Sequence, residues 1–92
     1  MTSEPGRFDT EWVEYAREQF NSLAPAVHQA VMALVGKLAG DPDPTRYGTY
    51  HEKFDNYRTN FAYGLITYTV VAERKTVILL RITVVEPRAP TS

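Results

Sequence analysis

The chain has 92 residues, 43% hydrophobic and 23% charged, which fits one globular domain and excludes a disordered chain. The absence of cysteine excludes disulfides and thiolate metal sites, and no apolar run approaches the roughly 18 residues that span a membrane. The net charge is −1. Residues 1–46 carry four basic and seven acidic side chains, and residues 47–92 carry six basic and four acidic ones. This separation of charge is far weaker than the basic surface of an obligate nucleic-acid binder.

The N-terminal residues predict no targeting segment. Residues 1–8 contain Pro5 and Gly6 and predict either a short edge strand or a flexible tail. They lack the basic and apolar character of a signal peptide, and together with the absence of cysteine this predicts a cytoplasmic protein.

Two amphipathic helices are predicted next. Asp9 or Thr10 is a candidate N-cap for the first, and Glu11 in its first turn suits the helix macrodipole. Pro25 fits the first turn of the second helix, and Gly40 fits its end. Because few residues separate them, the helices should pack as an antiparallel hairpin. Their apolar stripes are Trp12, Tyr15, Ala16, Phe20 and Leu23, and Val27, Ala30, Val31, Leu34, Val35 and Leu38.

The second half of the chain predicts a sheet. Residues 41–56 are expected to form a long polar loop, and three strands follow, with turns at Gly64 and around Glu73 to Lys75. Residues 86–92 are expected to form a flexible tail. We therefore predict a single α+β domain over residues 1–92, in which an N-terminal helical hairpin packs on an antiparallel sheet of three main strands, with room for a short N-terminal fourth.

Strand alternation predicts which sheet face is open. The unbroken apolar sets, such as Ile78, Leu80, Ile82 and Val84, should cover the helices. Assumed turn positions place Asn60 opposite Thr67, and Thr67 opposite Arg81. The open face is then either an ordinary solvated surface or a shallow anion-binding one. It would carry Arg58, Asn60, Thr67, Thr69, Arg81 and Thr83 among the aliphatic residues Leu65, Val71, Val77 and Leu79, which suggest that a partner covers part of it.

The best acid–base grouping is His51-Glu52-Lys53 in the predicted loop. Histidine is the residue type suited to proton transfer near neutrality, Glu52 could orient His51, and Lys53 could neutralise a phosphate. The alternative is an ordinary polar loop. Two histidines without cysteine do not predict a metal site, and no cofactor is expected.

The order of these elements is similar to that of a known family. The residues that carry the likeness are Phe8-Asp9, Leu23-Ala24-Pro25, Gly40-Asp41-Pro42, Tyr57-Arg58, Tyr63-Gly64-Leu65-Ile66-Thr67-Tyr68 and Val77-Ile78-Leu79-Leu80-Arg81-Ile82. Over roughly residues 8–85 the chain resembles the RelE/ParE superfamily of bacterial toxins from type II toxin–antitoxin pairs. RelE-like members cut mRNA in the ribosomal A site, ParE-like members poison DNA gyrase, and an antitoxin wraps and silences each.

The resemblance implies a growth-arresting toxin that acts on translation through ribosome-associated mRNA cleavage, with a cognate antitoxin as partner. For this function the candidate catalytic residues are Arg58, Arg81, His51 and Glu52, and the candidate phosphate-binding residues are Arg58, Lys53, Asn60, Arg81 and Arg88. Leu65 and Glu86 stand at usually basic positions, so the family's catalytic set is incomplete. Two alternatives stay open, a non-enzymatic gyrase inhibitor and a non-toxic member that only binds an antitoxin.

Overall fold

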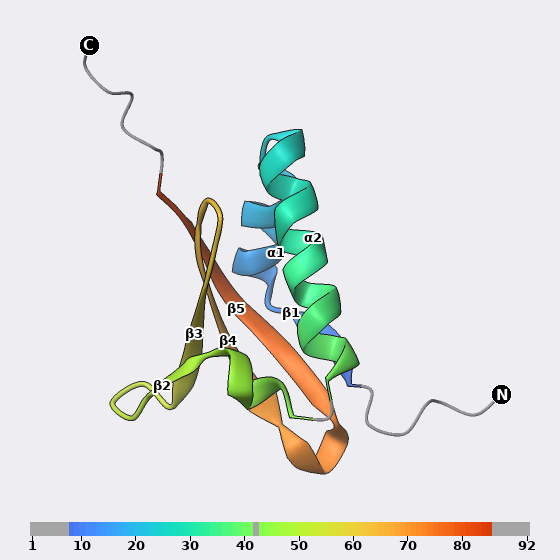
Figure 1. Ribbon diagram of the computed structural model, residues 1–92, viewed down its shortest axis with the longest axis vertical. Helices are drawn as coiled ribbons and strands as arrows, with labels where there is room; N and C mark the ends of the chain where they lie inside the picture. Colours follow the sequence, from blue (N-terminus) through green and yellow to red (C-terminus); the bar gives the residue numbers. More distant parts are fainter. Residues whose placement is uncertain (1–7, 42, 86–92) are drawn as a thin grey trace, which may run out of the picture.

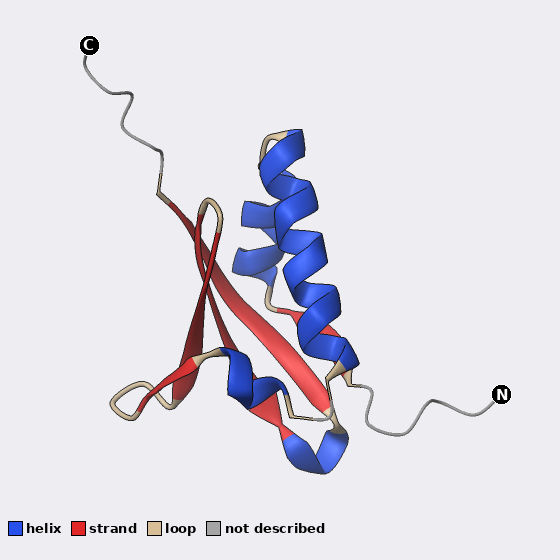
Figure 2. Cartoon of the chain, viewed as in Figure 1, coloured by secondary structure: helices blue, strands red, loops and turns tan. Residues whose placement is uncertain are grey.

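Two helices cover one face of a five-stranded sheet (Figures 1 and 2). The computed structural model describes residues 8–41 and 43–85, so the predicted tails at 1–7 and 86–92 lie outside the described residues. The strand order is β1-β5-β4-β3-β2, with β1 parallel to β5 and the other pairs antiparallel. The predicted α+β fold is confirmed. Its elements are β1 (Asp9–Trp12), α1 (Glu14–Asn21), α2 (Pro25–Gly40), η1 (Pro44–Tyr47), β2 (Thr49–His51), β3 (Asn56–Phe61), β4 (Gly64–Val71), η2 (Ala72–Arg74) and β5 (Thr76–Val84).

The N-terminal strand lies where the start of the first helix was predicted. Asp9 pairs with Thr76 and Glu11 with Ile78. The amide of Asp9 donates to the carbonyl of Lys75, just before β5, and the amide of Val13 donates to that of Leu79. Trp12 packs against the core. The predicted caps Asp9 and Thr10, and the placement of Glu11 in a helical turn, are therefore wrong. The helix α1 begins only at Glu14, without a side-chain cap bond.

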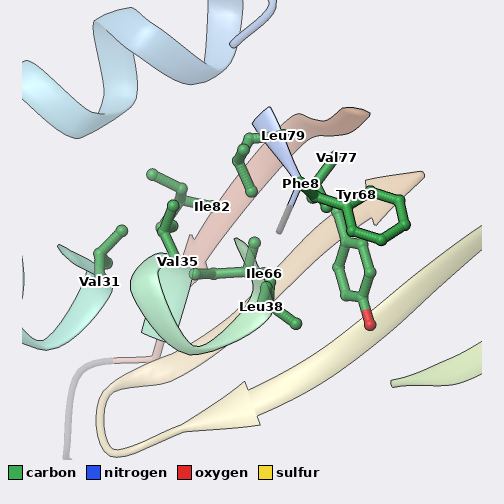
Figure 3. Close-up of a cluster of buried hydrophobic side chains, with 9 residues drawn as sticks. All are labelled: Phe8, Val31, Val35, Leu38, Ile66, Tyr68, Val77, Leu79 and Ile82. Carbon is green, nitrogen blue, oxygen red and sulfur yellow. The ribbon is translucent and has the colours of Figure 1, made fainter. Parts of the chain in front are cut away.

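The core lies between the helical hairpin and the sheet (Figure 3). The helix α2 begins at Pro25 and ends at Gly40, as its proline and glycine predict. The side chains of the buried cluster come from α2, β4 and β5 and from Phe8, so the hairpin and the sheet bury each other's apolar residues. The buried cluster consists of Phe8, Val31, Val35, Leu38, Ile66, Tyr68, Val77, Leu79 and Ile82.

A β-bulge at Leu80 changes the alternation of β5. Thr67 pairs with Arg81 and Tyr68 with Leu79, which leaves Leu80 without a partner on β4. Val77 and Leu79 before the bulge, and Ile82 after it, are all buried in the core. The prediction that Val77 and Leu79 lie on the open face is therefore wrong, because simple alternation does not anticipate the extra residue. The prediction for Arg81 is right.

Beyond the end of β1, a side chain of α1 forms the hydrogen bonds with the edge of β5. The β1 ladder with β5 ends at Trp12 and Leu79. Gln19 of α1 then donates from Nε2 to the carbonyl of Ile82 (2.7 Å) and accepts at Oε1 from the amide of Ile82 (2.9 Å). This amide thus satisfies both backbone groups of Ile82 and fixes α1 on the sheet.

We predict that Gln19→Leu lowers the free energy of unfolding by about 1–3 kcal/mol, because it leaves both Ile82 backbone groups unpaired in a half-buried place. Urea denaturation measures this as a lower midpoint with an unchanged slope. The exposed neighbour Glu18 provides the matched control Glu18→Leu. Equal midpoints for the two variants would contradict the role given to Gln19.

Candidate functional site

A polar row crosses four strands on the face away from the helices. Thr49 of β2 pairs with Arg58 of β3, Arg58 with Thr67 of β4, and Thr67 with Arg81 of β5. Directly opposed residues project from the same face, so the two arginines start from backbone positions on either side of Thr67 and share its face. Thr67 is only 8% exposed, as expected if the arginine stems cover it.

The register confirms one predicted pair and corrects another. Thr67 does oppose Arg81, but Asn60 opposes Leu65, not Thr67. The hairpin turn consists of Ala62 and Tyr63, and Gly64 is already the first residue of β4. A Cβ on Gly64 would overlap the carbonyl oxygen of Thr83, so β5 approaches too closely for any other residue here.

The two arginines are suited to binding an anion. Arg81 is exposed and Arg58 half-buried, and within the described residues neither has a carboxylate oxygen within 4.0 Å. Two strand spacings separate their Cα atoms, about 10 Å. A guanidinium fork binds phosphate or carboxylate with two parallel hydrogen bonds. The row therefore presents two such forks over a water-accessible face, with Asn60 exposed beside it.

The predicted acid–base group is split between a strand and a turn. Residues 49–51 form β2, which the prediction of a loop over 41–56 missed, and residues 52–55 form the turn to β3. His51 is two residues from Thr49 and so shares the face of Arg58. Glu52 and Lys53 are exposed in the turn, and no hydrogen bond joins His51 to Glu52 in the described part of the chain. Arg88 lies outside the described residues.

An exposed aromatic ring adjoins the arginine row. Phe54, in the turn between β2 and β3, is 58% exposed. The Nζ of Lys53 lies 5.6 Å, and the Cζ of Arg58 5.8 Å, from its ring centroid. Phe54 was not among the predicted site residues, although a phenylalanine next to a lysine in a polar segment is a usable signal.

The opposite face of β2, β3 and β4 holds stacked tyrosines. The ring centroids of Tyr50 and Tyr57 are 5.1 Å apart, and those of Tyr57 and Tyr68 are 5.6 Å apart. The Tyr68 hydroxyl donates to the carbonyl of Pro44 (2.8 Å), beneath Gly48, where a Cβ would lie 2.6 Å from that hydroxyl. These contacts attach η1 and β2 to the sheet.

The pKa values of Tyr47, Tyr50 and Tyr68 are raised. Burial, with smaller contributions from Tyr57 and Asp43, raises the pKa of Tyr68 to about 12. Hydrogen bonds to Asp55 and Asp41 raise the pKa of Tyr50 and of Tyr47. None of the three can therefore accept a proton as a general base near neutrality.

Two further searches cover the described residues only. No group of three or more histidine, acidic or cysteine side chains among them is placed to hold a metal ion. None of the helices in the described ranges is long and apolar enough to cross a membrane.

Comparison with solved structures identifies the fold of the chain. No family model and none of the curated proteins matches the chain. Among solved structures, it is similar to a chain of the toxin–antitoxin complex RelBE2 from Mycobacterium tuberculosis, with a TM-score of 0.79 and 19% identity over 94% of this chain and 100% of that one. It is also similar to a chain of the intact E. coli RelBE complex, with a TM-score of 0.72 and 16% identity over 87% of this chain and 99% of that one.

The chain has the RelE fold. The resemblance predicted from the sequence is thus confirmed for the fold. In this RelE fold the arginine row lies on the face away from the helices, and the stacked tyrosines determine where it lies on β3 and β4.

We predict that Tyr68→Phe destabilises the protein by about 1 kcal/mol at pH 7, because the buried Pro44 carbonyl loses its donor. The folded-state pKa of Tyr68 is raised, so its contribution is fully present below about pH 10 and is lost as the pH rises toward 12. Urea midpoints at pH 8, 10 and 11.5 should therefore fall more steeply for the parent protein than for Tyr68→Phe.

The exposed tyrosine Tyr15 supplies the control for this titration. Tyr15→Phe should keep the pH slope of the parent protein. If the urea midpoint of Tyr68→Phe falls with pH as steeply as those of the parent protein and Tyr15→Phe, the ionisation of Tyr68 does not affect folding.

Proposed function

We propose that this chain is the toxin of a bacterial toxin–antitoxin pair, and that it arrests growth through translation by ribosome-associated mRNA cleavage. Both solved structures to which it is similar are toxin–antitoxin complexes. The observation that carries the proposal is the pairing of Arg58 and Arg81 through Thr67 on the open face of a RelE fold. A cognate antitoxin is its partner, and the cytoplasm, where ribosomes are found, is its location.

The chemistry is a phosphoryl transfer within RNA. The 2′-hydroxyl loses its proton as its oxygen bonds to phosphorus, and the 5′-oxygen gains a proton as its bond to phosphorus breaks. Arg58 and Arg81 would stabilise the extra negative charge on the phosphate in the transition state. His51, on the same face, is the candidate for proton transfer, with Glu52 as the second candidate. Lys53, Asn60 and Arg88 remain predicted phosphate contacts. The scheme needs no cofactor.

One observation favours a second candidate function. Leu65 opposes Asn60 and Thr83 on the open face, so an aliphatic side chain occupies the place where the family resemblance implies an arginine. A face with two arginines and an incomplete catalytic set also fits a non-enzymatic inhibitor of DNA gyrase, or a member that only binds its antitoxin. In the gyrase case the contact surface would include the hairpin, where Met32 is 51% exposed.

Inducing the gene without its antitoxin, with separate pulse labels for protein and DNA synthesis, tests the three alternatives. We expect protein synthesis to stop first. DNA synthesis stopping first, together with loss of toxicity in Met32→Asp, would identify the gyrase inhibitor. Co-purification with an antitoxin but no effect on either label would identify the non-toxic member.

We predict that Arg58→Ala and Arg81→Ala each lower the rate of mRNA cleavage on purified ribosomes by about 100-fold, because each removes a cation from the transition state. The measurement is primer extension on a defined message. The exposed arginine Arg74 lies outside the row, and Arg74→Ala should cleave at the parent rate. Equal rates for all three variants would remove the row from the mechanism.

A further inference from the structure

The turn between β2 and β3 presents a large apolar side chain to water. Phe54 is 58% exposed, although the chain has a core in which a phenylalanine could be buried. Full burial of such a ring would stabilise the fold by roughly 1.5–3 kcal/mol. The turn lies far from the helical hairpin (Figure 1), so the ring belongs to no apolar cluster of the described residues. The fold therefore does not account for an aromatic residue at this place.

The turn that carries Phe54 is held by several bonds. The amide of Phe54 donates to the carbonyl of His51 (3.2 Å), and the amide of Asp55 donates to that of Glu52 (3.3 Å). Asp55 adopts a left-handed conformation, with φ of 52°, and accepts from the Tyr50 hydroxyl at 2.6 Å. The ring is thus presented from a defined turn, which lowers the entropic cost of binding against it.

Two cationic side chains lie close to the ring, in a turn that also carries the acidic residues Glu52 and Asp55. Lys53 and Arg58 lie 5.6 and 5.8 Å from its centroid, within the range of a cation–π interaction. With these cations beside it Phe54 is still 58% exposed, so part of the ring surface stays accessible. An aromatic surface beside cations is the arrangement that binds single-stranded nucleic acid, in which bases stack and phosphates pair with basic groups. An interface with a protein would gain nothing from both cations unless its partner were acidic.

The ring and the arginine row form one continuous surface. Arg58 lies beside the ring and is the first arginine of the row that continues through Thr67 to Arg81. A strand of RNA with one base on Phe54 would place its neighbouring phosphates toward Arg58 and Arg81. His51, which precedes the turn, shares this face.

We propose that Phe54 is a stacking platform for one nucleobase of single-stranded RNA, and that it positions the adjoining phosphate at Arg58. The inference rests on the proposed function, because it assumes RNA as the ligand of the arginine row. Stacking is possible with every base, so the platform adds affinity and alignment without selecting a sequence. Phe54 is thereby a positioning residue.

The test uses two fluorescein-labelled ten-nucleotide RNA strands, oligouridine and the same backbone with abasic sites at every position. Binding to the purified full chain is followed by fluorescence anisotropy at fixed low salt, because the phosphate contribution depends on salt. The variants are Phe54→Leu, which keeps an apolar side chain but no ring, and Phe54→Trp, which keeps a ring. Tyr15→Leu is the matched control, since Tyr15 is 55% exposed on α1 behind the sheet.

We expect Phe54→Leu to bind oligouridine about tenfold more weakly than the parent protein and the abasic strand equally well. Phe54→Trp and Tyr15→Leu should bind both strands like the parent. Unchanged oligouridine binding by Phe54→Leu would overturn the proposal, and so would an equal loss for both strands. It would also fail if the parent protein bound the two strands equally. An intact affinity for RNA with weakened capture of the antitoxin would instead assign the ring to a protein interface.

Arg58→Ala separates this inference from the proposed function. It should weaken binding to both strands, because it removes a phosphate contact. If Arg58→Ala binds both strands like the parent protein, RNA is not the ligand of the row and the proposed function fails. If Arg58→Ala weakens both strands but Phe54→Leu weakens neither, only the stacking platform is wrong.

Discussion

The single unpaired residue in β5 is the constraint on which the site depends. Leu79 and Ile82 are three positions apart, yet both are buried in the core, which no regular strand allows. The bulge at Leu80 absorbs the extra residue and directs Arg81 to the open face, opposite Thr67. In an unbroken ladder, burying Leu79 would bury Arg81 with it, at a large desolvation cost. The same irregularity thus completes the core and brings a second guanidinium group to the row.

The other half of the site is fixed from the core side. On β3 and β4 the residues that alternate with Arg58 and Thr67 include Tyr57 and Tyr68, which stack on each other and continue to Tyr50 on β2. A slip of one residue would exchange these rings with the polar row and break the Tyr68 bond to Pro44. The energy that holds the arginines in register therefore comes mostly from aromatic packing behind them, and little of it from contacts on their own face.

Sequence patterns predicted the helical hairpin well, since Pro25, Gly40 and a helical apolar period all agree on one element. They failed where the deciding contact is with a distant segment. The four residues of β1 show too little alternation of apolar and polar side chains to predict a strand. They form one because they pair with the edge of β5. Gly64 led to the prediction of a turn, but a glycine is needed there because the Thr83 carbonyl approaches it closely. The misplaced turn led to the wrong prediction that Asn60 lies opposite Thr67. For the site, Arg58 and Arg81 lie on the predicted face, whereas His51 was predicted in a loop and reaches that face from β2. The bulge at Leu80 depends on the pairing of β5 with β4, so it could not be predicted from the alternation of β5 alone.

The parallel pairing of β1 with β5 has a consequence for how the protein is made. The first strand joins the sheet only through β5, which is synthesised after every other described element and lies between β1 and β4. A nascent chain that lacks residues 76–84 cannot bury the apolar stripe of its helical hairpin against Val77, Leu79 and Ile82. It also lacks Arg81. Such long-range pairing delays folding until the partner strand has emerged. The sheet topology thereby keeps the arginine row incomplete until residues 76–84 have been synthesised and can pair with β4.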